Sequence, residues 1–266
     1  MKVSNPFINQ ARENGEKVII DSYNENAATK RGVAGKTLFL LLLAIISGSI
    51  VAIILNRTLL STNINAPGAE SALIQSLMVW LFVCLFMTLI SMLVGRLVPS
   101  TARFMAPVYS VAEGSLLGVI CTFAEIYLPG VTIAAGAATG ILFLLTFLVY
   151  NTGLKNHMSV VWRFFFIYFI SLMLVGIGVA LFLIFNNVSD TTYFYIDLAI
   201  SAAYLLYALI MLILTFDEAD MIVKSGLEKK YEWTVALGLI YTILYLFEQV
   251  LYIILIIAQH AGRSNN

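Results

Sequence analysis

The stretch LTFDEADMI (214–222) decides how this chain can fold, because it ends one long apolar run and precedes another. A short basic loop with Lys224, Lys229 and Lys230 separates it from the last apolar run, which carries Glu248 near its middle. Carboxylates at membrane depth are energetically costly and usually serve ion or proton transfer. The stretch therefore predicts a membrane protein whose acidic residues carry the function.

The composition excludes a soluble globular protein, because 61% of the 266 residues are hydrophobic and only 11% are charged. The 15 basic residues balance the 15 acidic ones, so nothing indicates a nucleic-acid partner and none is expected. Cys84 and Cys121 both fall inside apolar runs, which predicts neither a disulfide nor a metal site. Residues 1–35 are polar, so no signal peptide is expected.

Seven apolar runs follow this polar tail, each long enough to cross a hydrocarbon core that takes roughly 20 helical residues. Each is expected to be a helix, because an open strand would leave backbone groups unpaired in lipid. The predicted spans are 36–55, 72–95, 105–127, 130–150, 160–185, 193–216 and 233–259. We expect one all-α domain over residues 36–259, a seven-transmembrane-helix bundle, with a short external tail at 260–266.

The distribution of Lys and Arg predicts the orientation of these spans. Thirteen of the 15 basic residues fall in the tail and in alternate connections, and only Arg57 and Arg263 fall on the other side. This alternation supports seven spans rather than six and predicts a cytoplasmic N-terminus and an external C-terminus.

Two GxxxG motifs lie on neighbouring spans, at Gly114–Gly118 and Gly136–Gly140. Small residues at this spacing allow helices to approach closely. We expect both motifs to pack helices within one chain; a contact between two copies is the alternative.

The last span has one polar stripe on an otherwise apolar helix, because its polar residues recur every three or four positions. The stripe consists of Thr234, Gly238, Tyr241, Tyr245, Glu248 and Tyr252. Such a stripe turns toward other helices or toward a wet cavity. Two interpretations remain open: Glu248 belongs to an ion or proton path, or tyrosine hydroxyls hold it and it only joins helices.

Further carboxylates occur on other spans. Asp217 and Asp220 are three residues apart and share a helix face, although an acidic cluster beside lysines is often a solvated, salt-bridged loop. Glu113 lies about 12 Å along the third span from its cytoplasmic start. Carboxylates from different helices suggest a cation path, and oxygen ligands suit hard cations such as Ca²⁺.

Enzyme motifs are lacking: the chain has no HExxH and no P-loop. An aspartyl protease would need two buried aspartates close together, but Asp197 and Asp217 lie about 30 Å apart along one helix. We therefore expect no enzyme activity and no cofactor.

Several blocks resemble the Bax inhibitor-1-like family of bacterial membrane proteins, in the branch with a polar N-terminal tail. They are YSVAEGSLLG (109–118) with LPGV (128–131), YNTG (150–153), and the segment from FD (216–217) through KKYEW (229–233). The resemblance covers most of the chain, and the AEG and KKYEW parts are its specific motifs.

This resemblance implies an inner-membrane, seven-helix protein in which the other six spans surround the last one. It also implies a pH-sensitive Ca²⁺ leak gated by a pair of carboxylates, for which Asp217 and Glu248 are the matching residues and the transient Ca²⁺ ligands. The chain departs from the family pattern at Thr215, where Asp is common, and at Phe247, where the carboxylate is expected. The one-residue slip to Glu248 rotates a side chain by roughly 100° on a helix.

We therefore predict a path for Ca²⁺ or H⁺ with Glu248 at mid-membrane and Asp217, helped by Asp220, at the cytoplasmic end. Glu113 forms a third wall, and Tyr241, Tyr245, Tyr252 and Thr215 support the polar stripe. Another branch of the family resembles modulators of a membrane-anchored AAA protease. The alternative is therefore an interaction protein without ion conduction, which would contact that protease through residues 1–35 and the inner loops.

Overall fold

The computed structural model describes residues 27–61, 69–186 and 188–264. This part of the chain forms seven long helices, each long and apolar enough to cross a membrane, which confirms the predicted bundle. The elements are α2 (Lys30–Ser61), α3 (Ala69–Leu97), α4 (Ala102–Tyr127), α5 (Val131–Thr152), the 3-10 helix η1 (Leu154–His157), α6 (Met158–Phe185), α7 (Asp190–Lys224) and α8 (Lys230–Ser264).

Most of the helices are longer than the predicted spans. α2 begins at Lys30, inside the expected polar tail, and α7 continues to Lys224 instead of ending near residue 216. Apolar patterning marks only the part of a helix inside the hydrocarbon core, and polar residues can extend the same helix beyond that core. Of the expected tail, residues 1–26 lie outside the described residues.

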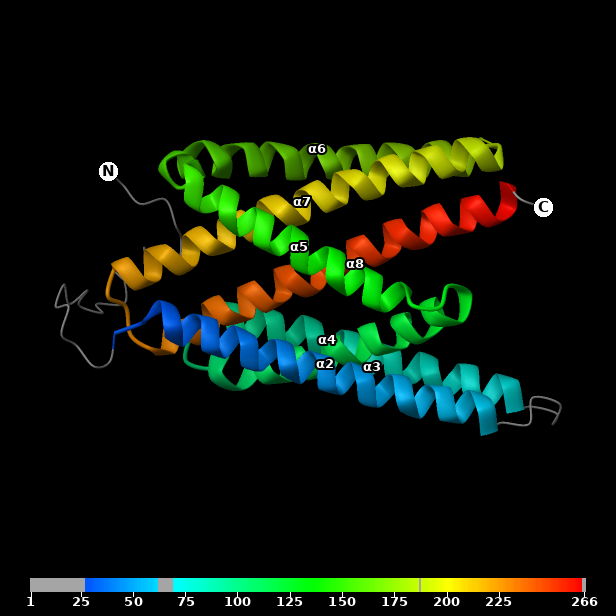
Figure 1. Cartoon of the computed structure of the whole chain (residues 1–266), viewed down its shortest axis with the longest axis horizontal. Helices are drawn as coiled ribbons and strands as arrows, with labels where there is room; N and C mark the ends of the chain where they lie inside the picture. Colours follow the sequence, from blue (N-terminus) through cyan, green and yellow to red (C-terminus); the bar gives the residue numbers. More distant parts are fainter. Residues whose placement is uncertain (1–26, 62–68, 187, 265–266) are drawn as a thin grey trace.

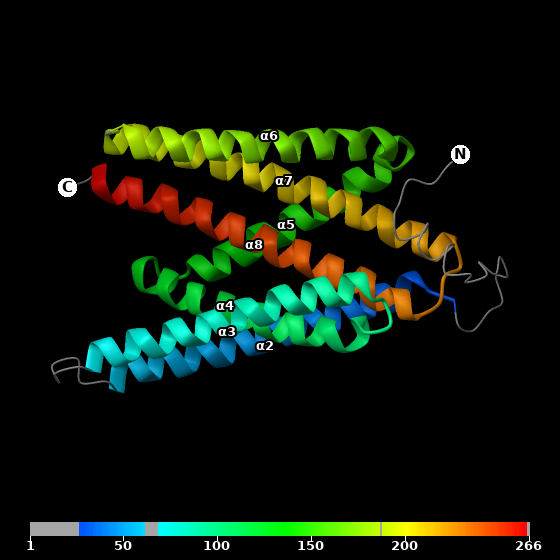
Figure 2. The same cartoon turned by 180° about the vertical axis from the view of Figure 1, so that it is seen from behind.

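α8 lies at the centre of the bundle and packs against α2, α3, α4, α5 and α7. Its inner positions Val235, Ala236, Leu237, Ile240 and Leu246 are fully buried. α6 packs mainly against α7 at one edge of the bundle, as both views show (Figures 1 and 2). The central position of the last helix is thus confirmed, with five helices around it and α6 outside α7.

The two GxxxG motifs have different surroundings. Gly114 and Gly118 of α4 pack against the backbone of Ala44 and Gly48 of α2, so a Cβ at Gly118 would lie 2.9 Å from the Gly48 Cα. A Cβ at Gly136 or Gly140 of α5 would meet nothing within 4 Å. Packing within the chain is therefore confirmed for the first motif and wrong for the second.

Alanine at Gly118 is expected to lower the free energy of unfolding, because the added methyl group would strike the backbone of α2. Overpacking of this kind typically destabilises by about 1–3 kcal/mol. Gly140→Ala is the matched control, since it makes the same change in an equivalent motif with open space above it. Thermal unfolding of both variants in detergent checks the prediction, and equal stabilities would contradict it.

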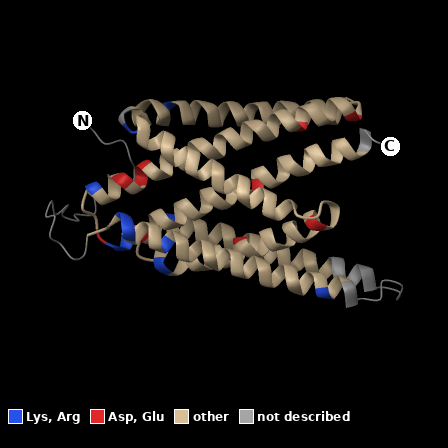
Figure 3. Cartoon of the chain, in the orientation of Figure 1, with Lys and Arg blue, Asp and Glu red and all other residues tan. Residues whose placement is uncertain are grey.

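Charge is distributed unevenly along the bundle, with most Lys and Arg residues gathered at one end (Figure 3). We call this the basic end; α2 and α8 begin there, and α3 and α7 end there. The middle of the bundle presents large exposed apolar side chains, such as Phe82 of α3 and Leu174 of α6. The exposed apolar belt is the surface that a bilayer would cover, and the chain is a multi-pass membrane protein.

Candidate functional site

The acidic patch of α7 is buried near the basic end. Asp217, Glu218 and Asp220 are 8%, 4% and 7% exposed, although they lie only one to two turns before the helix ends at Lys224. The acids lie in the last two turns of α7, as the sequence predicts, but they are buried and do not form a solvated loop. The helix runs past them because helical hydrogen bonding continues beyond the apolar core, and other elements pack over them.

Asp220 joins four elements through its carboxylate. Its oxygens lie 2.7 Å from Lys30 Nζ of α2 and 2.5 Å from Lys155 Nζ of η1, and Lys224 Nζ is 3.7 Å away. The Tyr150 hydroxyl of α5 donates a hydrogen bond to it at 3.2 Å and also interacts with Asp217. The hydrogen bond to Asp220 raises the pKa of Lys155, which lies between two spans, so Lys155 remains charged at neutral pH.

Glu218 forms a second ion pair, deeper in the bundle. Arg96 of α3 donates from Nη2 to Glu218 Oε2 at 3.1 Å, while Glu218 Oε1 is buried and has no hydrogen-bond partner among the described residues. The same guanidinium lies against Gly238 of α8, where a Cβ would come within 2.7 Å of Nη1. Glycine at 238 therefore leaves room for the Arg96 guanidinium beside the central helix.

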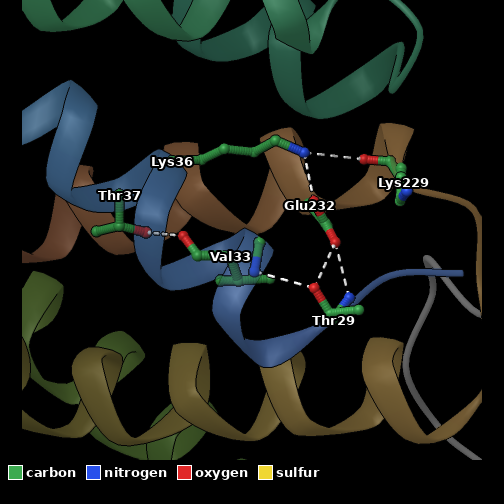
Figure 4. A network of polar contacts seen from close by, with 7 residues as sticks. Thr29, Val33, Lys36, Thr37, Lys229 and Glu232 are labelled. Atoms are coloured by element: carbon green, nitrogen blue, oxygen red, sulfur yellow. Dashed lines mark hydrogen bonds and ion pairs between the residues drawn. The ribbon is translucent and has the colours of Figure 1, made fainter.

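Glu232 holds the start of α2 against the start of α8 (Figure 4). Its Oε1 accepts hydrogen bonds from the Thr29 backbone N–H at 2.7 Å and from the Thr29 hydroxyl at 3.3 Å, and its Oε2 is ion-paired with Lys36. Ala28 also donates its backbone N–H to the Leu227 carbonyl at 2.7 Å. We call these contacts of Glu232 with Thr29 and Lys36, and of Ala28 with Leu227, the clasp. The clasp holds the segment before α2 against the loop between α7 and α8.

Glu113 of α4 and Glu248 of α8 form a separate acidic group at mid-depth. They lie close enough for their charges to repel each other, and the Tyr109 and Tyr241 hydroxyls lie within the field of both carboxylates. The rings of Tyr109 and Tyr241 meet edge to face with centroids 6.4 Å apart. Within the part of the chain that the structure describes, neither glutamate has an ion pair, so this is a carboxylate pair without a basic partner.

Asp217 and Glu248 are not brought together in this conformation. Thr215 of α7 lies at the level of Gly238, because a Cβ at Gly238 would be 3.3 Å from Thr215 Cγ2. Glu248 is ten residues further along α8, or about 15 Å along its axis. Since α7 and α8 are antiparallel, Asp217 lies on the far side of Thr215, in the group around Asp220. Their pairing as a gate stays a prediction.

The polar stripe of α8 faces other helices over most of its length. Tyr241 stacks on Tyr245 with ring centroids 6.2 Å apart, and Thr234 is 1% exposed. Tyr252, which is 47% exposed, donates to the carboxylate of Asp197 on α7 at 3.2 Å, toward the end opposite the basic end. Tyr252 therefore joins helices rather than lining the mid-depth acidic pair.

Two further polar residues, Thr215 and Glu125, have local roles. Thr215 donates its hydroxyl hydrogen to the Met211 carbonyl at 2.8 Å, within its own helix. Glu125 accepts backbone N–H hydrogen bonds from Gly130 and Thr132 at 2.6 and 2.9 Å and so caps the start of α5. Among the described residues, no group of three or more His, Cys, Asp or Glu side chains could hold a metal ion.

Sequence reasoning missed three partners, namely Arg96, Glu218 and Glu232. Arg96 entered the argument only as a basic residue between two spans, yet its side chain points into the bundle. Glu232 lies in the KKYEW segment, and an acid in the first turn of a helix is commonly only a favourable partner for the helix dipole. No spacing rule links these residues, because their partners are distant in sequence.

Comparison with known proteins agrees with this architecture. No match is found among the curated proteins or among the solved structures. A family model described as "Bax inhibitor 1 like" matches residues 5–259, which is nearly the whole chain. This seven-span protein, with its central last helix and its buried acids on α4, α7 and α8, therefore belongs to the Bax inhibitor 1 like family.

Proposed function

We propose that the protein passes cations, Ca²⁺ or H⁺, through the bundle along a proton-sensitive path. The observation that carries the proposal is that Glu113 and Glu248 lie close enough at mid-depth for their charges to repel, without an ion-pair partner among the described residues. Two neighbouring carboxylates repel when both are charged, so a proton or a cation between them relieves the repulsion. Ionisable residues this deep in a membrane mark ion or proton pathways by default.

The pair suits an ion in transit rather than a resident one. Ca²⁺ takes about 6–8 oxygen ligands, more than two carboxylates and their tyrosine neighbours supply. An incomplete ligand set binds weakly, and weak binding allows release to the next position. Protonation of either glutamate removes the negative charge that attracts the cation, so cation flux should fall as pH falls.

A barrier separates this pair from the basic end. Tyr241 interacts with both glutamates and also with Arg96, whose guanidinium is paired with Glu218. Asp217 and Asp220 lie beyond that pair, where Asp220 is held by Lys30 and Lys155. In this arrangement Arg96 closes the path, and Asp217 and Asp220 of α7 form the end of the path nearest the basic end.

Orientation and location are part of the proposal. Basic residues are concentrated on the cytoplasmic side of membrane proteins. The basic end would therefore face the cytoplasm in a bacterial inner membrane, with the N-terminus inside and the C-terminus outside. No enzyme activity and no cofactor are part of this function.

A flux assay in liposomes tests the proposal. Purified full-length protein is reconstituted around a Ca²⁺ dye, and influx is compared at a mildly alkaline and a mildly acidic pH. Wild type should conduct better at the alkaline pH, whereas Glu248→Gln and Glu113→Gln should lower the flux by about tenfold, which corresponds to about 1.4 kcal/mol. Asp217→Asn should lower the flux less, since Asp217 lies at the end of the path nearest the basic end.

Glu228→Gln is the matched control, because the Glu228 side chain is 61% exposed and its ion pair with Lys230 is long, at 3.4 Å. Its flux should equal that of wild type. Absence of flux in wild type, or equal flux in all variants, would remove the ion path. In that case the protease-modulator function becomes the better proposal, and its test is co-purification of a protease that depends on residues 1–35.

A further inference from the structure

A long apolar groove lies between α2 and α5, away from the mid-depth glutamates. It has a volume of about 1030 Å³, and its lining includes Leu41 and Ile45 of α2, Phe143 and Phe147 of α5, and Ile243 of α8. Figure 1 shows α5 crossing α8. Residues of α8, with others of α4 and α7, line the groove between its α2 and α5 walls, and we call the α8 part its floor. Of the acidic residues of the proposed ion path, Asp220 lines the groove and Glu113, Glu248 and Asp217 do not.

The groove opens sideways onto the apolar belt of the bundle. Gly136 and Gly140 line its α5 wall, and a Cβ at either position would meet nothing within 4 Å. Ile133 and Leu144 beside them are 79% and 60% exposed. Because its glycines carry no side chains, the second GxxxG motif leaves the groove open on the side that faces hydrocarbon.

The end of the groove nearest the basic end is polar. Lys30, Asn151, Tyr150 and Asp220 line it there, and the Lys30 side chain is 66% exposed. A lysine ammonium has three N–H donors. Lys30 can therefore donate to an anionic group from outside while it remains paired with Asp220.

We propose that this groove binds an acyl chain of a phospholipid from the leaflet at the basic end, with the lipid phosphate beside Lys30. An unfilled space in hydrocarbon forfeits the dispersion contacts of its lining, so a chain from the surrounding bilayer fills it. The groove follows α2 from Lys30 to Ala52, or about 33 Å along the helix, and a bilayer core is about 30 Å thick. One leaflet spans about half of that core, so an acyl chain that enters beside Lys30 would fill the half of the groove nearest the basic end, with its phosphate at the entrance.

A second copy of the chain is the main competing occupant, because GxxxG motifs also mediate helix association. Such contacts need small residues that let two backbones approach. Here the glycines share the α5 wall with the bulky rings of Phe143 and Phe147, and the small residues of α2 and α4 that also line the groove, such as Gly48 and Gly114, already pack against each other. A partner helix would also bring no second anion to Lys30, whose exposed ammonium is paired with Asp220. These features favour the lipid.

Photolabelling of the floor tests the proposal. Full-length protein is reconstituted in vesicles containing phosphatidylglycerol with a diazirine in its acyl chain, irradiated, and mapped by peptide mass spectrometry. Label is expected on Leu239 and Ile243, which line the groove and which lipid reaches only by entering it. Gly140→Trp should lose this label by filling the groove. Gly178→Trp is the matched control on α6, where a Cβ also meets nothing within 4 Å, and it should keep the label.

A headgroup arm identifies the role of Lys30. Lys30→Gln should reduce floor labelling by the phospholipid but not by a photoreactive diacylglycerol, which has no phosphate. Should Gly140→Trp fail to fold, Gly136→Leu serves the same purpose. An unlabelled floor beside labelled Leu174, which is 65% exposed on α6, would overturn the proposal. Cross-links between two copies at Gly136 and Gly140, lost in Gly140→Trp, would assign the groove to self-association instead.

Discussion

Replacing Arg96 by glutamine is expected to raise cation flux through the reconstituted protein by about tenfold or more, because it removes a positive charge from the closed path. Unit charges 4 Å apart interact by about 4 kcal/mol at an effective dielectric constant of 20, and tenfold in rate requires only about 1.4 kcal/mol. Arg96 lies beside Tyr241 and Gly238, between the mid-depth glutamates and the basic end. The assay is Ca²⁺ influx into liposomes.

The same change should destabilise the protein, because Glu218 is 4% exposed and Arg96 is its ion-pair partner. A buried charge left alone typically costs about 3–5 kcal/mol. The double variant Arg96→Gln/Glu218→Gln removes both charges, so it should recover most of the unfolding temperature and keep the raised flux. The double variant therefore separates the effect of Arg96 on cation flux from its effect on stability.

Lys155→Gln is the control for charge at the basic end. It removes one of the three lysines that contact Asp220, but it lies outside the spans. Its flux should change little. Wild-type flux in the double variant would show that Arg96 does not close the path, whatever its effect on stability.

The sequence was sufficient for the fold because two strong signals agree. Hydrophobic length gave the number of spans, and the alternation of basic residues supported the third span, which Pro107 and Glu113 dilute. The helix ends were less predictable. Lys30 and Lys224 are polar, so no apolar pattern marks the turns where α2 begins and α7 ends. Packing then decided which GxxxG motif was used, and only Gly114–Gly118 found a helix of its own chain to approach.

The sequence predicted which residues belong to the candidate site better than it predicted which of them lie together. Periodicity correctly put Glu248 on a stripe with Tyr241 and Tyr245, which face other helices. It could not give the partner of Glu248, because which helix lies opposite depends on tertiary packing. In the structure Glu113 of α4 is near enough to Glu248 for their charges to repel, while Asp217 interacts with Tyr150 and Asp220. The ion pairs on Glu218 and Glu232 link segments distant in sequence, so no local pattern revealed them.

Alanine at Glu232 is expected to release the start of α2 from α8 and to lower the free energy of unfolding by about 3 kcal/mol. Glu232 is 2% exposed, and its carboxylate accepts the Thr29 N–H and pairs with Lys36. Removing it leaves a partly buried ammonium and a backbone donor without their acceptor, and it removes a negative charge near the positive end of the α2 dipole. Thermal unfolding in detergent measures the loss.

Hydrogen exchange distinguishes release of α2 from general destabilisation. In Glu232→Ala, amides of residues 28–36 should exchange faster than those in the middle of α4, because the clasp acts only at the basic end. Glu232→Gln keeps an oxygen acceptor for Thr29 but loses the charge that holds Lys36, so its protection should be intermediate. Glu228→Gln changes an exposed carboxylate four residues away and should exchange as wild type does. Unchanged exchange at residues 28–36 in Glu232→Ala would show that packing of α2 against α4, through Gly48 and Gly118, holds the helix without the clasp.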